Sequence, residues 1–362
     1  MPIIDKNLHK LVILATGRAA SRSELEFLNT LATDGNYTAL IAVVNSYFEA
    51  RALGDGAAET LNSVMNNGFS IKADSKETEI TAGALDSGVL SWANYLTEII
   101  FSNSTYSSVL EARADSAINL VQRLDEEEKS DFFLKPAFLL GIKNLTQGIN
   151  FNSLDHINLD TYFDPFLSAL KDDGISFSVS LLSDAIAFID YDGDGLKSSN
   201  EITLLLDESN NFLIPYSVET GTIVVSGGVD KYSDKAFESL LKAPFGATIV
   251  NRQTTLFQSL LDANYSIFDS LGFAEKLLSY PLGVSIFNYD PLLSIFDKDA
   301  SKESVKTSLT IEKDSLAVST FVNLAKQILA ADVDPENKVN ISNLAESLIV
   351  KKIIRDNFNS DG

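Results

Sequence analysis

The segment D-Y-D-G-D-G-L-K-S-S-N-E, residues 190–201, has the residue types and the spacing of a calcium-binding loop. Calcium takes about six to eight oxygen ligands, and a twelve-residue loop supplies them at alternate positions, with a glycine at the sharp turn and a glutamate at the end. The glycine is Gly195, which can adopt the positive φ of that turn. The sequence predicts a Ca2+ site whose ligands are Asp190, Asp192, Asp194, the carbonyl of Leu196, Ser198 and Glu201.

The segments on either side predict how this loop is held. S-L-L-S-D-A-I-A-F-I (180–189) is expected to form an entering helix, and E-I-T-L-L-L (201–206) an exiting helix, which would make the loop EF-hand-like. Lys197 takes the position where paired loops have an aliphatic residue that bridges to the partner loop. We therefore expect a solitary calcium loop; an acidic surface turn is the alternative.

Two other acidic segments begin in a similar way. In D-V-D-P-E-N-K-V-N-I-S-N (332–343) oxygen ligands occur at suitable positions, but Asn343 stands where the charged bidentate ligand is needed. An ordinary interhelical loop is the preferred interpretation, and a second calcium site is the alternative. D-K-D-A-S-K-E (297–303) lacks both the glycine and the closing acid, and we expect a helix cap there.

The elements that must position the calcium loop are mostly helices. Ser21 and Glu24 have the spacing of a capping box, and Leu25, Leu28 and Leu31 follow at helical spacing. The acidic run at 125–130 is typical of a surface corner. We expect a mainly α fold, with a helical domain over residues 1–128 and an α-rich second domain over residues 129–362.

Strand-forming residues occur soon after the calcium loop. N-F-L-I-P-Y (211–216) and T-G-T-I-V-V-S-G-G (220–228) combine apolar and β-branched residues with turn residues. These two segments predict a short β-hairpin within the second domain.

Composition and charge exclude several functions. The 362 residues carry a formal net charge of −22, which repels nucleic acid and anionic membranes and attracts cations. There is no cysteine, so disulfides, thiolate zinc sites and cysteine nucleophiles are excluded. The sequence has no run of about 18 apolar residues, so we expect no membrane insertion. The first residues lack the features of a Sec signal peptide.

No motif in the sequence indicates catalysis. The two histidines, His9 and His156, are far apart and are expected to lie on the surface or in the core. We find no nucleophile elbow, no phosphate-binding glycine loop and no H-E-x-x-H helix. Trp92 lies in an apolar helical pattern and is expected in the core. The chain is therefore predicted not to be an enzyme.

The first third of the chain suggests a family. A-T-G-R-A-A-S-R-S-E-L-E-F-L-N-T-L-A-T-D-G-N-Y-T-A-L-I-A-V-V-N-S-Y-F (15–48) resembles the helical N-terminal modules of bacterial surface-layer and RTX-type secreted proteins, and G-V-L-S-W-A-N-Y-L follows a similar pattern. The resemblance implies type I secretion and calcium-dependent assembly or attachment to surface polysaccharide. The glycine-rich calcium repeats usual in that family are not in the sequence, so we expect the N-terminal part of a longer protein.

Together these features predict a non-enzymatic, calcium-binding protein of the bacterial cell surface, such as a surface-layer or adhesin component. Its expected location is extracellular, and its expected partners are surface polysaccharide or further copies in a lattice. One alternative is a secreted hydrolase or lyase that acts on polysaccharide and uses calcium structurally. An intracellular calcium sensor is a weaker alternative, because a solitary loop has no partner loop and the sequence has only 2 methionines.

Overall fold

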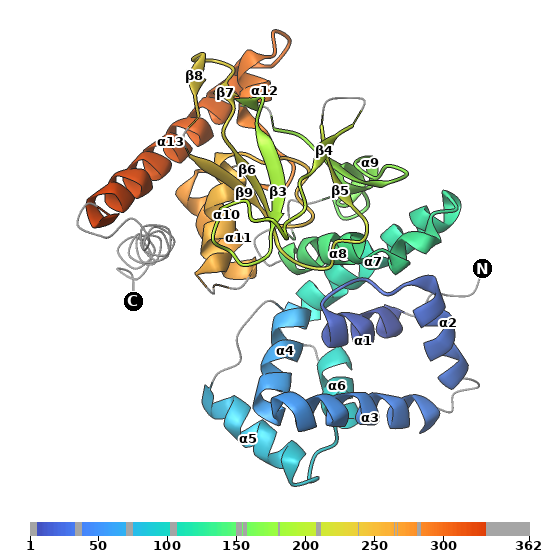
Figure 1. The fold of residues 1–362 in the computed structure, drawn as a ribbon. Coiled ribbons are helices and arrows are strands. Elements are labelled where there is room, and N and C mark those ends of the chain that lie inside the picture. The colour runs from blue at the N-terminus through green and yellow to red at the C-terminus, as the bar shows by residue number, and fades with distance from the viewer. Residues whose placement is uncertain are drawn as a thin grey trace. The chain divides into compact units, whose positions relative to one another are not determined.

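The computed structural model describes residues 6–330, apart from short segments at 33–37, 70–74, 102–106, 150–153, 155–157, 180–181, 208–210, 238, 264, 266 and 281–283. The chain divides into two compact units (Figure 1). Unit 1 comprises Met1–Lys135 and Ile142–Phe163, and unit 2 comprises Pro136–Gly141 and Asp164–Gly362. The fold is mainly α, as the sequence predicts, and the strands that the structure describes all lie in unit 2.

Helices build unit 1, and α1 packs against both α4 and α7. The predicted capping box is confirmed at the start of α2, where Ser21 Oγ accepts the N–H of Glu24 and the Glu24 carboxylate accepts the N–H of Ser21. Trp92 is buried and stacks on Phe48 with ring centroids 5.3 Å apart, so its predicted place in the core is also confirmed. The helices are α1 (Lys6–Thr16), α2 (Arg22–Leu31), α3 (Thr38–Asp55), α4 (Ala57–Phe69), α5 (Ser75–Asp86), α6 (Trp92–Phe101), α7 (Ser107–Glu126) and the second part of α8 (Pro136–Gly148).

A fully buried arginine of α7 binds the C-terminal ends of two helices in unit 1. Arg113 donates from Nη1 to the carbonyl of Asn67 near the end of α4, at 2.7 Å. It also donates to the carbonyls of Gln147 (2.7 Å) and Ile149 (3.0 Å) at the end of α8. These carbonyls carry the negative end of each helix dipole and offset the buried positive charge. Burial lowers the pKa of Arg113 to about 9, so the side chain stays charged at neutral pH.

The C-terminal end of α1 contacts Asn67 and Gln147, whose carbonyls bind Arg113. Gly17 has a φ of 78° and donates its N–H to the carbonyl of Ile13 at 2.7 Å, which ends the helix. Asn67 donates from Nδ2 to the carbonyl of Leu14, and Gln147 donates to Asn67 Oδ1. A Cβ at Gly17 would lie 2.6 Å from Gln147 Nε2 and 2.8 Å from Asn67 Oδ1. Both the backbone conformation and the lack of space therefore require glycine at this position.

His9 of α1 makes unit 1 sensitive to acid. Its ring is fully buried, neither ring nitrogen has a hydrogen-bond partner among the described residues, and burial lowers its pKa from 6.5 to about 4. The unfolded chain therefore binds a proton near pH 6.5, whereas the folded chain resists protonation until about pH 4. Stability falls as the pH is lowered through this window, and we expect a loss of about 2 kcal/mol between pH 7 and pH 5 from this residue.

Urea unfolding at pH 7 and pH 5, followed by the fluorescence of the single tryptophan, Trp92, measures this loss within unit 1. Because carboxylates elsewhere also titrate, the informative quantity is the difference between the wild type and His9→Leu. The variant should lose less stability than the wild type between the two pH values. Equal losses in the two proteins would show that His9 is not the source of the acid sensitivity.

The described residues of unit 2 form three small antiparallel sheets, with strand orders β1-β5-β4, β2-β7-β8 and β3-β6-β9. Strands form at both predicted segments, as β5 and β6, but β5 pairs with β1 and β4 whereas β6 pairs with β3 and β9. The predicted hairpin between them is therefore wrong. The strands are β1 (Gly174–Phe177), β2 (Leu182–Ser183), β3 (Ile186–Asp190), β4 (Leu205–Leu206), β5 (Phe212–Pro215), β6 (Thr222–Ser226), β7 (Val229–Asp230), β8 (Lys235–Ala236) and β9 (Leu240–Ala243).

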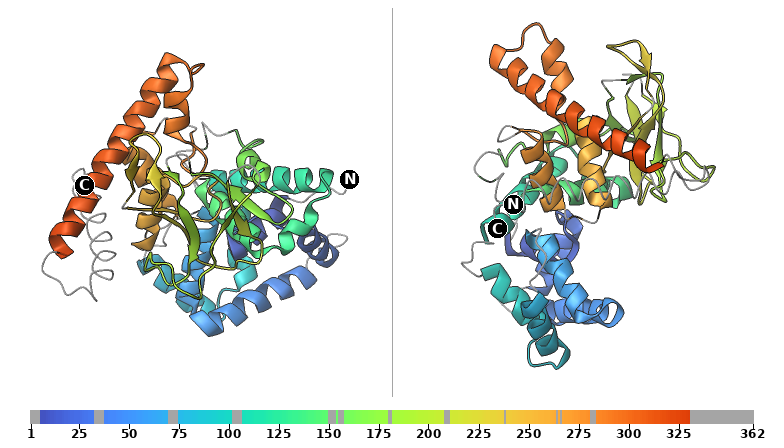
Figure 2. Two further views of the ribbon diagram at one scale, coloured as in Figure 1. Left: turned by 45° about the horizontal axis from the view of Figure 1, so that its top comes forward. Right: turned by 90° about the vertical axis from the view of Figure 1, so that its left-hand side faces the viewer.

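Helix α10 (Arg252–Asp262) packs against β9 and also contacts α11 (Ile267–Leu277). The short helices α9 (Asp164–Ser168) and α12 (Pro291–Phe296) complete the unit together with the long helix α13 (Lys302–Ala330), which lies beside α12 (Figure 2). Ser301 Oγ accepts the N–H of Ser304 at the start of α13, which confirms the predicted helix cap within 297–303. Among the helices that the structure describes, none combines the length and the apolar character needed to cross a bilayer.

Candidate metal centre

The loop at 190–201 joins two strand-like segments, so the predicted flanking helices are wrong. The entering segment forms β2 and β3, and the exiting segment continues into an isolated bridge and β4. The two sides of the loop pair with each other: Ile189 donates its N–H to the carbonyl of Ile202 at 3.0 Å, and Leu204 donates to Ala187 at 2.8 Å. Residues 190–201 therefore close an antiparallel strand pair, not a helix–loop–helix unit.

The entering segment is a strand for two physical reasons. Asp184 has a φ of 53°, which interrupts any helix between β2 and β3. Ala187, Phe188 and Ile189 are all fully buried, so both faces of β3 are covered. A strand buried on both faces reads as a continuous apolar run, which periodicity alone does not distinguish from a buried helix.

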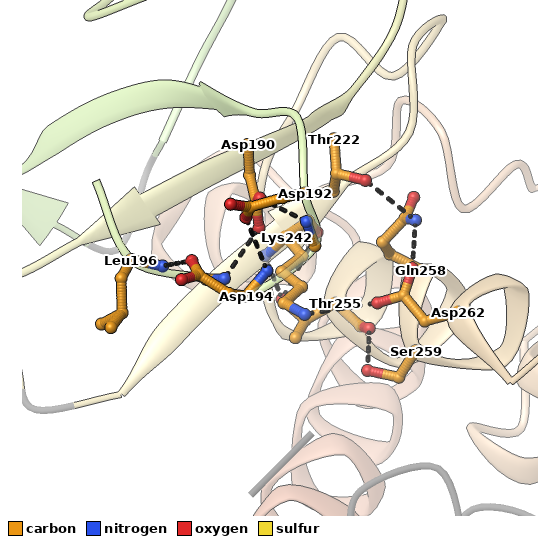
Figure 3. A network of polar contacts seen from close by, with 12 residues as sticks. Asp190, Asp192, Asp194, Leu196, Thr222, Lys242, Thr255, Gln258, Ser259 and Asp262 are labelled. Atoms are coloured by element: carbon orange, nitrogen blue, oxygen red, sulfur yellow. Dashed lines mark hydrogen bonds and ion pairs between the residues drawn. The ribbon is translucent and has the colours of Figure 1, made fainter. Parts of the chain in front are cut away.

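Three of the predicted ligands come together in space. Carboxylate oxygens of Asp190, Asp192 and Asp194 lie within 4.8 Å of one another (Figure 3). Asp190 is the last residue of β3 and is only 2% exposed, whereas Asp194 is half-buried and Asp192 is exposed. The loop thus presents a fixed, buried carboxylate at its base and two accessible carboxylates above it.

Backbone N–H groups hold these carboxylates in place. Asp190 accepts from Gly193 at 2.7 Å and from Gly195 at 2.8 Å, one N–H on each oxygen. Gly193 and Gly195 have φ values of 77° and 74°, which lets the loop curl around the Asp190 side chain. Asp192 accepts from Asp194, and Asp194 accepts from Leu196 at 2.6 Å. Every one of these carboxylates keeps further lone pairs that could bind a cation.

The remaining predicted ligands lie on the second half of the loop. Glu201 is 5% exposed and accepts the N–H groups of Tyr191 (3.0 Å) and Ser198 (2.8 Å), so it ties the two ends of the loop together. Glu201 stands outside the group of three aspartates. Ser198 Oγ is hydrogen-bonded to Asn200. The Leu196 side chain is apolar and exposed, so the only group by which Leu196 could bind a cation is its carbonyl.

The two buried carboxylates of the loop, Asp190 and Glu201, repel each other. Burial raises the pKa of Asp190 above its ordinary value, and the charge of Glu201 raises it further. The N–H groups of Gly195 and Gly193 and the ammonium of Lys242 act in the opposite direction. A divalent cation at the loop would offset this repulsion, because it brings positive charge to carboxylates that water reaches poorly.

Four residues beside the loop could not be assigned from the sequence (Figure 3). Lys242 of β9, only 5% exposed, lies 3.2 Å from a carboxylate oxygen of Asp262 in α10. Gln258 donates to the other oxygen of Asp262 at 2.8 Å and to Thr222 Oγ1 at 3.3 Å. The one signal available was a lysine inside the apolar strand L-L-K-A, since a buried lysine requires a partner.

The oxygen donors fit a hard divalent cation. Carboxylates, a carbonyl and a hydroxyl are the ligands that calcium prefers, and a loop rich in glycine can adjust to its variable coordination. Of the ligands predicted from the sequence, the structure brings together Asp190, Asp192 and Asp194, with Asp190 at the base. The second candidate loop at 332–343 lies outside the described residues, and so does His156.

Neither a protein-family model, nor a curated protein, nor a solved structure matches this sequence or fold.

Proposed function

We propose that this chain is a non-enzymatic, calcium-binding protein of the bacterial cell surface, in which Ca2+ stabilises unit 2 after export. The main support for this proposal is the loop at 190–201, where three aspartate side chains converge and two carboxylates, Asp190 and Glu201, are buried. Its expected partners are surface polysaccharide or other copies of the chain in a lattice.

Whether such a loop is occupied by calcium depends on whether the protein is inside or outside the cell. Calcium is millimolar outside cells and far lower in the cytosol, so a site with a dissociation constant of ~10⁻⁴ M is empty inside and filled outside. Binding to the folded state alone, at a concentration about a hundredfold above the dissociation constant, stabilises a protein by about 2.7 kcal/mol. The net charge of −22 and the lack of cysteine also agree with a protein that acts outside the cell.

Removal of calcium should lower the thermal stability of the protein. In calorimetry with EDTA, we expect the melting temperature of unit 2 to fall by roughly 5–10 °C relative to millimolar calcium, and added calcium should restore it. An identical melting curve with and without calcium would contradict the proposal.

Terbium luminescence can show that this loop is the site. Tyr191 is the second residue of the loop, and its phenol can transfer excitation energy to a terbium ion bound beside it. We expect strong sensitised emission that millimolar calcium displaces. Tyr191→Phe should lose most of the emission and keep the calcium-dependent melting temperature, which separates this loop from the candidate at 332–343. Unchanged emission from the variant would place the ion elsewhere.

The cell-surface part of the proposal needs a separate test. Calcium should promote either assembly of the protein, measured by sedimentation velocity and electron microscopy, or its binding to polysaccharide extracted from bacterial surfaces. Micromolar calcium affinity together with calcium-induced exposure of apolar surface would instead favour an intracellular sensor. Cleavage of a glycan from a panel would favour a polysaccharide-acting enzyme.

A further inference from the structure

Lys242 places a buried positive charge on the sheet face that carries the base of the calcium loop (Figure 3). It lies in β9 opposite Val224 of β6, which in turn lies opposite Phe188 of β3. Side chains two residues apart on a strand share a face. Asp190, two residues beyond Phe188, therefore lies on the same face of the sheet as Lys242.

The ammonium of Lys242 forms an ion pair with Asp262. Asp262 lies 3.2 Å away at the end of α10, and about 40% of its side chain is exposed. Gln258 orients this carboxylate, because it donates to Asp262 and also to Thr222. Thr222 is the residue opposite Asp190 in the sheet. Lys242 and Asp262 are thus fixed relative to the loop by strand pairing and by side-chain hydrogen bonds.

We propose that Lys242 and Asp262 set the affinity of the loop for Ca2+, with Lys242 weakening binding and Asp262 strengthening it. The inference rests on the calcium site proposed above. A positive charge that solvent screens poorly repels a divalent cation nearby, and a carboxylate in contact with that charge reduces the repulsion. Without a cation, the positive charge of Lys242 acts on the Asp190 carboxylate and partly neutralises it, so it stabilises the empty loop relative to the filled one.

The physiological consequence is a deliberately weak site. A loop with three aspartates and a closing glutamate has the ligand charge for tight binding, yet a cell-surface protein benefits from a site that stays empty during synthesis. The lysine shifts the affinity toward the extracellular calcium range and leaves the ligand set unchanged. Lys242 and Asp262 therefore act on the affinity through their charges and are not calcium ligands.

Titration of the full chain with calcium, by isothermal calorimetry, tests this inference. We expect Lys242→Met to bind calcium about tenfold more tightly and Asp262→Asn about tenfold more weakly than the wild type. Lys235→Met and Asp173→Asn remove the same charges from exposed positions of unit 2 and should leave the affinity within about twofold. A purely structural role for the pair would weaken binding in both Lys242→Met and Asp262→Asn.

The two proposals fail in different ways. If the wild type binds no calcium, the calcium site itself is wrong, and the role of Lys242 is wrong with it. If the wild type binds and the two variants do not shift the affinity in opposite directions, only the role of the pair is wrong. If Lys242→Met does not fold, Lys242→Gln serves in its place, because it keeps a polar group for Asp262. We expect Lys242→Gln to bind calcium more tightly than the wild type, and weaker binding would overturn the inference.

Discussion

Replacing Arg113 by methionine is expected to lower the free energy of unfolding of unit 1 by about 3–5 kcal/mol. The guanidinium is fully buried and donates to the carbonyls of Asn67, Gln147 and Ile149. Methionine fills part of the volume but donates nothing, so buried carbonyls at the ends of α4 and α8 lose a donor together. Urea unfolding followed by Trp92 fluorescence and by circular dichroism measures the loss.

The matched control is Arg123→Met, a substitution ten residues later in the same helix, α7, where the side chain is only half-buried. We expect that variant to change the stability by less than about 1 kcal/mol. Arg113→Lys should be nearly as damaging as Arg113→Met, because a single ammonium cannot reproduce the planar fork of the guanidinium. A small loss in Arg113→Met would show that the helix ends are satisfied in another way.

Replacing Asp190 by asparagine is expected to weaken calcium binding at least about a hundredfold, which corresponds to about 2.7 kcal/mol. The substitution removes a buried charged ligand. It also places an N–H₂ group against one of the two N–H donors, Gly193 and Gly195, that Asp190 now accepts. The curl of the loop is therefore damaged along with the ligand set. Isothermal calorimetry with calcium gives the affinity.

Asp173→Asn, an exposed aspartate in the same unit, is the control for the loss of one negative charge. The terbium signal sensitised by Tyr191 should disappear in Asp190→Asn and persist in Asp173→Asn. Retention of the wild-type calcium affinity by Asp190→Asn would mean that the ion, if bound, does not use the base of this loop.

Local patterns predicted the helices of unit 1 well. The capping box of Ser21 and Glu24 and the core position of Trp92 depend on residues close in sequence, and the structure confirms both. Prediction failed in the segment before the loop at 190–201, because the apolar run at Ala187, Phe188 and Ile189 is buried on both faces. Only the pairing with β6, about thirty-five residues away in sequence, makes that run a strand.

Some residues of the candidate site could likewise be predicted from the sequence, and others could not. The alternating aspartates and Gly195 could be found from twelve consecutive residues, because their spacing is fixed by local backbone geometry. Lys242, Gln258 and Asp262 follow the loop by forty residues or more, and they reach it only through the register of β3, β6 and β9 and the packing of α10. No local pattern in the sequence carries that information.

The strand pairing on both sides of the loop has a mechanical consequence. Hydrogen bonds from Ile189 to Ile202 and from Leu204 to Ala187 hold the two ends of the loop together, so occupancy cannot swing them apart as it does in a hinge between helices. A bound ion would instead cross-link the loop that joins the two strands. Under tension, the filled loop would require a higher pulling force before the two strands separate.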